Sequence, residues 1–276
     1  MDREKDLQYW IDQWEDKENR RGDQEAFWDN RADFFNEKVF SDEGTGSEVV
    51  DLLASKGLLT KEMKVLDIGC GPGKHTLPMA KKVQKITALD LSEKMIGHLR
   101  ENMKTAEIQN IEPVHLDWKD ADLENHQWKK AFDLVFASMS PGISDFDTLK
   151  KMLEASRKIC FLSSFVKRTD EIGDEVSDYI EKKYRAPPKQ HEKIYYVFNL
   201  LWKMGYTPEV SYMRRSWKDT MTMEEAMSLY RDKMSSLVTL TDEDEEAIRS
   251  ILEKRSSKGR VHEQTEVTIG LLIWEV

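Results

Sequence analysis

The spacing of hydrophobic residues changes from helical to strand-like near residue 64 of this 276-residue chain. Before that point the apolar positions recur every three or four residues, which is typical of amphipathic helices. We predict two such helices from two groups of residues: Leu7, Trp10, Ile11 and Trp14, then Phe27, Arg31, Phe34 and Phe35. A third helix is predicted from Ser47 to Gly57.

Short apolar runs and helical segments then alternate along the middle of the chain. The predicted strands are "KVLDIG", "KITALD", "IEPVHLD", "FDLVFAS" and "KICFLSSF", and segments such as "SEKMIGHLRENMK" between the earlier ones have helical periodicity. Strands that alternate with helices predict right-handed crossovers and a mostly parallel sheet, so the fold class is α/β.

The pattern changes again in the last third of the chain. A long helix, "HEKIYYVFNLLWKMG", is followed by two predicted strands of opposite sense, "PEVSYMRRSW" and "TEVTIGLLIWEV". The segment 218–259 between them has helical spacing at Met223, Met227 and Tyr230, which predicts a helical insertion. We therefore predict an N-terminal helical lid over 1–43 and a main domain over 44–276 that contains this insertion.

Composition indicates a globular protein in water. Hydrophobic residues make up 39% and charged residues 34% of the chain, and no apolar run approaches the roughly 20 residues that span a bilayer. The first residues, "MDREKDLQYW", lack the basic start and apolar run of a secretory signal. We expect a cytoplasmic protein without a membrane partner.

The distribution of charge argues against a nucleic-acid partner. The net charge is −10, and residues 1–43 hold seven Lys or Arg against fourteen Asp or Glu. Nucleic-acid-binding proteins usually present a basic face that neutralises phosphates. The only two cysteines, Cys70 and Cys160, lack metal-like spacing, so neither a disulfide nor a metal site is expected.

The stretch "VLDIGCGPGKHTLPMA" contains the strongest candidate for a binding site. A predicted strand ends near Asp67, a turn contains Gly69, Gly71 and Gly73, and a helix begins near Lys74. Glycine permits positive φ angles and leaves room for a ligand beside the backbone, and a helix start offers unpaired N–H groups. The Gly-x-Gly-x-Gly spacing is one residue tighter than the dinucleotide fingerprint, and no Gly-Lys-Ser/Thr phosphate loop is present.

In these residues the chain resembles the class I S-adenosylmethionine-dependent methyltransferases of the small-molecule type. "LDIGCGPG" is similar to their first motif, and "ALDLS" ends the next strand with Asp90, 17 positions after Gly73. Asp117 in "VHLDW" and the strand end "FDLVFASMS" follow in the family's order. The resemblance implies a Rossmann-like seven-stranded sheet of order 3-2-1-4-5-7-6 with the last strand antiparallel, and S-adenosyl-L-methionine as cofactor.

The resemblance places Asp90 at the ribose hydroxyls, Asp117 at the adenine and the end of the fourth strand at the methyl donor. Some residues have a second interpretation: Arg31 pairs with the methionyl carboxylate or with nearby acids, Leu91 and Met95 flank adenine or belong to the core, and His75 touches ligand or is solvated. The predicted cofactor-binding residues are Trp28, Arg31, Asp67, Gly69, Cys70, Gly71, Gly73, Asp90, Leu91, Met95, Asp117, Trp118 and Ser138.

The acceptor site is less visible in the sequence, because methyl transfer depends mainly on positioning and needs a base only for a protonated acceptor. No catalytic residue is assigned. The place after the fourth strand reads "SMSPG", without the aromatic of the Asp/Asn-Pro-Pro-Tyr motif found in enzymes that methylate amide or exocyclic amino nitrogens. The candidates for acceptor contacts are Met139, Ser140, His191, Tyr195, Tyr196, Tyr212 and Arg214.

The function predicted from the sequence is transfer of a methyl group from S-adenosylmethionine to a small or medium-sized metabolite. The alternatives are a non-catalytic S-adenosylmethionine-binding scaffold or activator subunit, and a protein or RNA methyltransferase. A nicotinamide-dependent oxidoreductase is disfavoured by the glycine spacing. The sequence does not predict the accepting atom or the oligomeric state.

Overall fold

The computed structural model describes residues 3–15, 24–41, 47–185, 192–235 and 237–276. The strands are β1 (Lys64–Ile68), β2 (Lys85–Asp90), β3 (Ile111–His115), β4 (Phe132–Ser138), β5 (Ser156–Asp170), β6 (Glu209–Thr222), β7 (Ser256–Ser257) and β8 (Arg260–Glu275). The helices are α1 (Arg3–Glu15), α2 (Gln24–Asp29), α3 (Ala32–Ser41), α4 (Ser47–Ser55), α5 (Thr76–Ala80), α6 (Glu93–Thr105), η1 (Trp118–Asp120), α7 (Phe146–Ala155), α8 (Glu171–Tyr184), α9 (Lys193–Met204), α10 (Met223–Ser235) and α11 (Asp242–Glu253).

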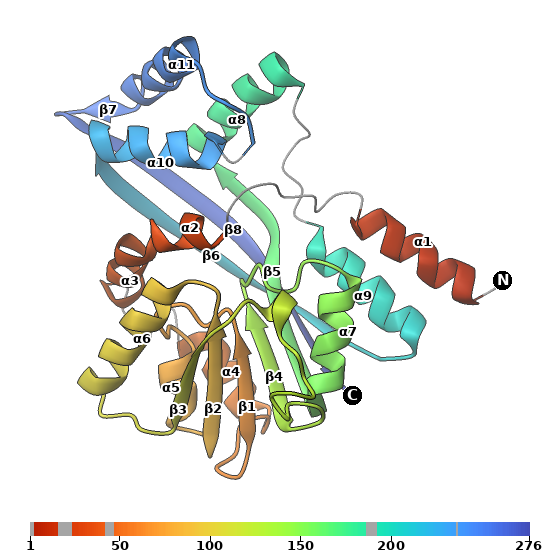
Figure 1. The fold of residues 1–276 in the computed structure, drawn as a ribbon. Coiled ribbons are helices and arrows are strands. Elements are labelled where there is room, and N and C mark those ends of the chain that lie inside the picture. Colours follow the sequence, from red (N-terminus) through yellow and green to blue (C-terminus); the bar gives the residue numbers. More distant parts are fainter. Residues whose placement is uncertain (1–2, 16–23, 42–46, 186–191, 236) are drawn as a thin grey trace.

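One sheet runs through the whole molecule in the order β3-β2-β1-β4-β5-β8-β6, and the short β7 pairs with β8 (Figure 1). Strands β1 to β5 pair in parallel, and β8 is antiparallel to both neighbours. The predicted order is therefore confirmed, with β6 as its sixth strand and β8 as its seventh. Because β1, β2 and β4 are parallel, their carboxyl ends meet at one edge of the sheet, where ligands bind in open α/β folds.

Both faces of the sheet are covered, which explains why the central strands are almost wholly apolar. Helices α4, α5 and α6 pack with Val65 and Phe136 on one face. Helices α1, α7 and α9 pack with Leu66 and Val135 on the other. Successive strand residues therefore alternate between two cores, as the period of two requires. Within the described residues, no helix has the length and apolar character needed to cross a membrane.

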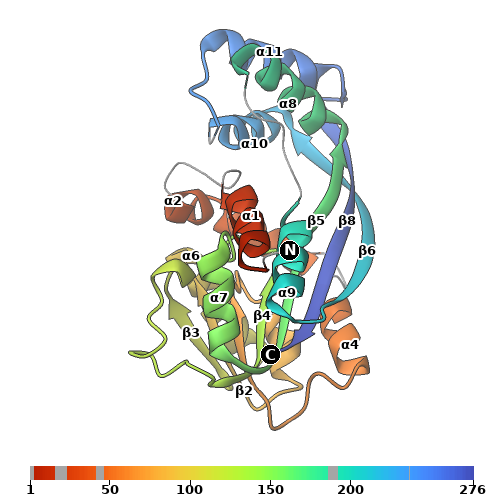
Figure 2. The same cartoon turned by 90° about the vertical axis from the view of Figure 1, so that its right-hand side faces the viewer.

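Strands β5, β6 and β8 continue well past the other strands and carry a second layer of helices (Figure 1). Helices α8, α10 and α11 pack on this extension around a separate apolar core that includes Ile180, Tyr230 and Leu252. Figure 2 shows the three long strands bending beneath these helices. We call this part, residues 166–185 and 217–267, the upper lobe.

The upper lobe corrects two boundaries predicted from the sequence. Strand β6 extends to Thr222, so residues 218–222 belong to the sheet and the helical insertion begins at Met223. Strand β5 extends to Asp170, five residues past the predicted "KICFLSSF". Both extensions have polar residues on one side, such as Lys218 and Lys167, so the hydrophobic pattern alone underestimates their length.

The N-terminal helices pack in two different places. Helix α1 packs against α9 and α7, with Trp14 buried in the core and Lys203 Nζ 2.8 Å from Asp6 Oδ2. Helices α2 and α3 contact α6 instead. In both cartoon views α2 lies between α6 and α10. The predicted boundary at residues 43 and 44 lies outside the described residues.

Candidate functional site

The glycine turn after β1 has the backbone conformation that its sequence predicts. Gly69, Gly71 and Gly73 have φ angles of +72°, +56° and +102°, in a region that L-residues with side chains rarely adopt. A Cβ atom on Gly69 would lie 2.8 Å from the Cβ atom of Ser140, whereas one on Gly71 would meet only the ring of Phe35, at 3.8 Å. A Cβ atom on Gly73 would lie 2.7 Å from Leu99 Cδ1. The turn therefore needs glycine for its conformation at all three positions and for space at Gly69 and Gly73.

Asp90 ends β2 directly beside this turn. Its Oδ2 accepts the Gly71 N–H at 2.9 Å and its Oδ1 accepts the Ser92 N–H at 3.0 Å. Burial raises the pKa of Asp90, and these two N–H donors act against that rise. Each carboxylate oxygen has a second lone pair. Asp90 therefore fixes the turn and retains acceptor capacity for hydroxyl groups.

Asp67 is the buried acid at the end of β1. Its Oδ2 accepts the hydroxyl of Thr76 at 2.6 Å, which links the strand to the first turn of α5. Burial raises the pKa of Asp67 to about 7, and Asp90 adds to the rise. The Thr76 hydroxyl lowers the pKa but does not outweigh burial. Asp67 therefore stabilises the turn through its hydrogen bond with Thr76. Its carboxyl group titrates near neutrality.

This pKa predicts a pH-dependent stability. Because the folded state binds the Asp67 proton more tightly than the unfolded state, this contribution is full below the unfolded value near 3.8 and is lost as the pH rises through about 7. Asp67→Asn removes the titration. We expect the free energy of unfolding of the variant, minus that of the wild type, to rise by up to ~4 kcal/mol between pH 4 and pH 8 in urea denaturation. Parallel pH profiles would contradict the assignment.

Cys70 lies inside the turn but is not a nucleophile. Its side chain is buried, and burial together with the charges of Asp90 and Asp67 raises the pKa of the thiol well above its ordinary value. A reactive cysteine needs the opposite environment. Cys70 packs in the core with Leu77 and Leu99, and it borders the turn with its backbone.

The residues predicted at the adenine side lie around the ends of β2 and β3. Asp117 is half-buried and its Oδ1 accepts the Lys119 N–H at 2.9 Å, while Leu91 is also half-buried. Trp118 and Met95 are buried, and the Trp118 indole N–H donates to the Thr148 carbonyl at 3.1 Å. The side chain of Trp118 therefore packs against α7, and Asp117 and Leu91 remain the accessible members of this group.

A chain of three polar side chains crosses the ends of β4 and β5. Nε2 of His75 is 3.2 Å from the Ser138 hydroxyl oxygen, which is 2.9 Å from the Ser163 hydroxyl oxygen. Ser138 was predicted, and Ser163 was not. Next to them, Met139 has a φ of +55° and Ser140 Oγ accepts the Gly142 N–H at 3.0 Å. The structure thus brings His75, Ser138 and Ser140 together beside the glycine turn.

Helices α2 and α3 pack against α6, the helix that follows Asp90 in the chain. The Ser92 hydroxyl donates to Asp29 Oδ1 at 2.5 Å, and Asp33 Oδ1 is 2.8 Å from His98 Nε2. Of the predicted cofactor residues here, Trp28 is half-buried and its ring is 6.3 Å from that of Phe35. The guanidinium of Arg31 lies 4.6 Å from the centroid of Phe27. The sequence did not point to Asp29, because a single acid in an acidic segment carries no signal.

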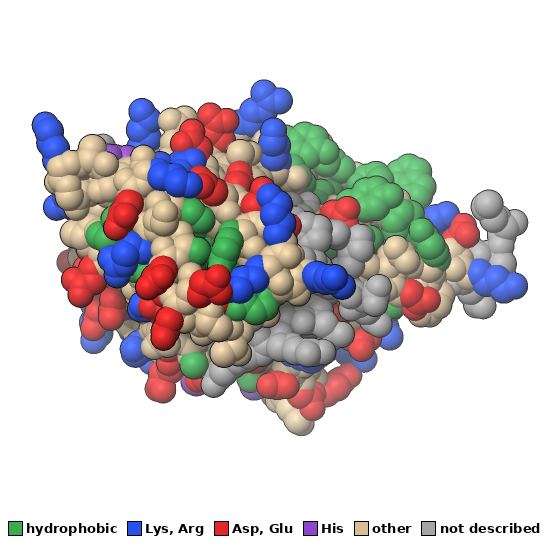
Figure 3. All heavy atoms as spheres, turned by 90° about the horizontal axis from the view of Figure 1, so that it is seen from above, with side chains coloured by type: hydrophobic (Ala, Val, Ile, Leu, Met, Phe, Trp, Pro, Cys, Tyr) green, Lys and Arg blue, Asp and Glu red, His purple; other side chains and the backbone are tan. Residues whose placement is uncertain are grey.

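Other predicted acceptor contacts are not brought to this site. Tyr195 is more than half exposed and its ring is 5.2 Å from that of Trp10. Seen from above, hydrophobic side chains gather at one side of the molecule (Figure 3). Tyr196 is buried and donates to Glu192 Oε2 at 2.8 Å. Arg214 is exposed on β6, as is Tyr212. His191 lies outside the described residues.

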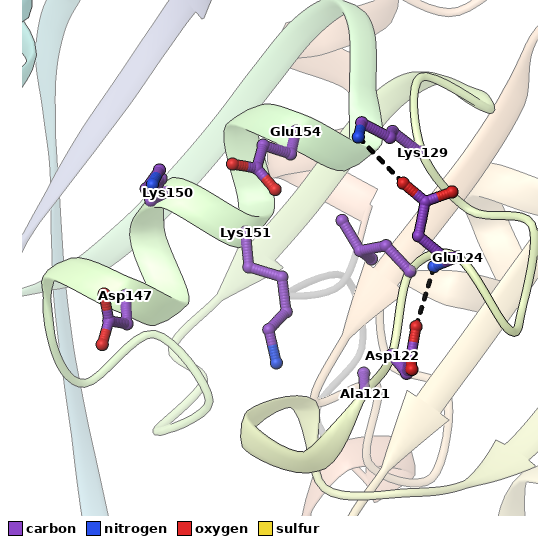
Figure 4. A pocket seen from close by; sticks show the side chains of 9 residues that line it. Ala121, Asp122, Glu124, Lys129, Asp147, Lys150, Lys151 and Glu154 are labelled. Carbon is purple, nitrogen blue, oxygen red and sulfur yellow. Dashed lines mark hydrogen bonds and ion pairs between the residues drawn. The ribbon is translucent and has the colours of Figure 1, made fainter.

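A separate surface pocket of about 290 Å³ lies between α7 and the loop 121–129 (Figure 4). Its lining is mostly charged, and Lys129 Nζ lies 2.8 Å from Glu124 Oε1. None of its lining residues comes from the glycine turn or from the end of β2. We therefore do not assign it to the candidate site.

Comparison with known proteins agrees with the geometry. Residues 65–160 match the family model described as a methyltransferase domain. An uncharacterized protein from Haemophilus influenzae is 30% identical over 142 residues, which cover 51% of this chain and 50% of that protein. A 23S rRNA (uracil(1939)-C(5))-methyltransferase from Aeromonas hydrophila is 28% identical over 106 residues, covering 37% of this chain and 23% of that protein. The chain thus spans half or less of these curated relatives.

Among solved structures, a putative methyltransferase from Bacillus halodurans has a TM-score of 0.52 at 17% identity, over 83% of this chain and 98% of that chain. At this identity the likeness concerns the fold alone. The names of the relatives give different substrates. The match therefore identifies a methyltransferase domain but does not identify the methyl acceptor.

Proposed function

We propose that this chain, whose residues 65–160 form a methyltransferase domain on the class I fold, transfers a methyl group from S-adenosylmethionine to a small or medium-sized metabolite. The observation that carries the proposal is the joint geometry of the glycine turn and Asp90. Backbone that leaves room for a ligand and a buried carboxylate with spare acceptor capacity lie side by side at the carboxyl edge of the sheet.

The residues at the site fit this cofactor. The turn at Gly71 leaves the ligand side of the backbone open up to the Phe35 ring, and Asp90 has lone pairs for the two ribose hydroxyls. Asp117 and Leu91 are accessible where adenine is expected. Trp28 stays a predicted cofactor contact, and Arg31 stays a predicted partner of the methionyl carboxylate. When bound, the cofactor supplies an electrophilic methyl group on its sulfonium sulfur.

The chain's own contribution to the reaction is positioning and, for a protonated acceptor, removal of a proton. His75 is a candidate base at the end of β4, where its Nε2 is aligned by the Ser138 hydroxyl. Ser163 in turn fixes the hydroxyl of Ser138. In this arrangement His75 takes a proton at Nε2 directly from the acceptor or through Ser138.

A small acceptor is supported by the surroundings of the site. Helices α2 and α3 approach the glycine turn on one side, where Phe35 faces Gly71, and the upper lobe stands above the same sheet edge (Figure 1). The segment 1–43 has twice as many acids as bases. A site flanked by helices and next to an acidic segment favours a metabolite over a nucleic acid.

A methyl-transfer assay tests this function. Purified protein and radiolabelled S-adenosylmethionine are incubated separately with a metabolite panel, with total RNA and with denatured cell protein. We expect label in one or a few small molecules and none in the two polymers. Label in RNA or protein alone would exclude the small-molecule acceptor and leave the methyltransferase assignment intact.

We further propose that the lid predicted from the sequence consists of α2 and α3. Their hydrogen bonds with α6 involve exposed or half-buried groups such as Asp29 and Asp33. Ala32 and Val39 of α3 are buried but lie outside the two cores of the sheet, whereas α1 is anchored in the core by Trp14. Polar surface contacts open more readily than apolar core contacts. We propose that residues 24–41 close over the bound cofactor while α1 stays fixed.

Hydrogen exchange with and without S-adenosylhomocysteine checks the lid. We expect the amides of residues 24–41 to exchange about tenfold or more slowly with ligand, and those of α1 (residues 3–15) to remain unchanged as an internal control. Equally strong protection of 24–41 in both states would show that these helices are fixed packing and not a lid.

A further inference from the structure

Helix α7 holds the segment after β3, where the adenine of the cofactor is expected. The three-residue helix η1 comes directly after Asp117, and a 3-10 helix this short has little stability of its own. Its shape therefore depends on the side chains that bind its two ends. Asp117 binds the first end, because its Oδ1 accepts the Lys119 N–H at 2.9 Å.

Lys151 of α7 binds the other end of η1. Its Nζ donates to the carbonyl oxygens of Trp118 and Lys119, at 3.0 and 2.8 Å, and lies 5.6 Å from the centroid of the Trp118 ring. Carbonyl oxygens in the last turn of a helix carry partial negative charge, which a cation stabilises. Lys151 thus ties the carboxyl end of η1 to α7.

Helix α7 is a fixed support for η1. Thr148 and Lys151 are three positions apart on α7, so they lie on the same face of this helix. The Thr148 carbonyl accepts the Trp118 indole N–H at 3.1 Å, and Trp118 is only 1% exposed. Leu149 and Met152 of the same helix are buried in the core beneath the sheet. Two points of η1 are therefore bound to a helix that cannot shift without disturbing this core.

Asp117 lies beside the strand that ends in Asp90. His115 of β3 pairs with Asp90 of β2, and the Leu116 N–H donates to the Asp90 carbonyl at 3.0 Å. A base attached to a ribose at Asp90 therefore reaches the end of β3. Asp117 is half-buried, and its Oδ2 makes no hydrogen bond to another residue in the described part of the chain. Because an ionised carboxylate is an acceptor only, Oδ2 suits an amino group.

We propose that Lys151 is a positioning residue for the adenine base, which it affects through η1 and Asp117. The inference rests on the proposed function. Lys151 fixes the carbonyl end of η1, and η1 in turn fixes the Asp117 carboxylate so that Oδ2 accepts the amino group of adenine. Without Lys151 this charge-assisted hydrogen bond becomes longer or is lost. The ribose contact at Asp90 comes from another strand and does not depend on Lys151.

The test compares S-adenosylhomocysteine with its purine analogue, which lacks only the amino group of the base. Lys150→Met is the matched control, because Lys150 is the exposed neighbour of Lys151 and its replacement removes the same charge from the same helix. Figure 4 shows Lys151 pointing from α7 toward the chain at Ala121, whereas Lys150 does not.

Titration calorimetry measures both ligands on each protein. We expect the wild type and Lys150→Met to bind S-adenosylhomocysteine about tenfold more tightly than the purine analogue. In Lys151→Met we expect this ratio to fall to about twofold, because the affinity for S-adenosylhomocysteine falls and that for the analogue stays unchanged. Lys151→Gln keeps an N–H donor and serves if Lys151→Met does not fold; we expect a ratio of a few fold.

A double variant shows whether Lys151 acts through Asp117. Both changes then affect the same hydrogen bond, so Lys151→Met combined with Asp117→Ala should bind S-adenosylhomocysteine as well as Asp117→Ala alone. Equal losses for the two ligands in Lys151→Met would make Lys151 merely structural and overturn the proposal. Additive losses in the double variant, or a wild type that does not prefer adenine, would also overturn it. Absence of S-adenosylhomocysteine binding by folded wild-type protein would instead contradict the proposed function itself.

Discussion

Gly71→Val is expected to weaken binding of S-adenosylhomocysteine by at least about 100-fold. Gly71 has a φ of +56°, where a β-branched residue is strained, and its N–H is held by Asp90. A valine side chain would also project toward the Phe35 ring, into the space assigned to the ligand. Titration calorimetry on folded protein measures the loss.

Gly57→Val is the matched control for this variant. Gly57 also has a positive φ, of +71°, but a Cβ atom there meets nothing within 4 Å, and the residue lies past the end of α4. Both variants should lose similar stability from backbone strain, on the order of 1–2 kcal/mol. Only Gly71→Val should lose binding. Normal affinity in folded Gly71→Val would place the ligand elsewhere.

Asp90→Ala is expected to weaken cofactor binding by about 2–3 kcal/mol, or roughly 30- to 150-fold. The change removes a charged acceptor from the ribose hydroxyls. It also frees the Gly71 and Ser92 N–H groups that the carboxylate now holds, so the turn loses its fixed shape. Calorimetry with the cofactor and with its demethylated product gives the size of the effect.

A variant of a second buried acid, Asp133, distinguishes a loss of cofactor binding from a loss of stability. Asp133 is as buried as Asp90, and its carboxylate binds Arg157 and the Lys64 N–H at the other end of the sheet. Asp133→Ala should therefore destabilise the fold without changing affinity for the cofactor. If Asp133→Ala weakened binding as much as Asp90→Ala, the losses would reflect general destabilisation and not contact with the ribose.

The sheet and the glycine turn were predictable because local sequence determines them. Strands buried on both faces give continuous apolar runs, and Gly69, Gly71 and Gly73 stand where the backbone needs positive φ. Asp90 was predictable from its distance to the turn. These features depend on residues close together in the chain, or on a spacing that the family repeats.

The upper lobe was not predictable in the same way. About half of the residues at the ends of β5 and β6 are polar. Their partners on β8 are about a hundred residues away in the chain for β5 and about forty-five for β6. The β-bulge at Val166 of β5 depends on pairing register, which leaves no trace in the hydrophobic pattern. Tyr195 and Arg214 are exposed and stay predicted acceptor contacts. Their positions were not predictable, because the residue type does not determine which face of a helix or strand an aromatic or cationic residue occupies.

The cofactor site at Asp90 is tested most directly by titration calorimetry of the wild-type protein with S-adenosylhomocysteine, repeated with Asp90→Ala and Asp133→Ala. We expect one saturable site per chain, weakened in Asp90→Ala and retained in Asp133→Ala. Absence of binding by folded wild-type protein, or undiminished binding by Asp90→Ala, would contradict this assignment.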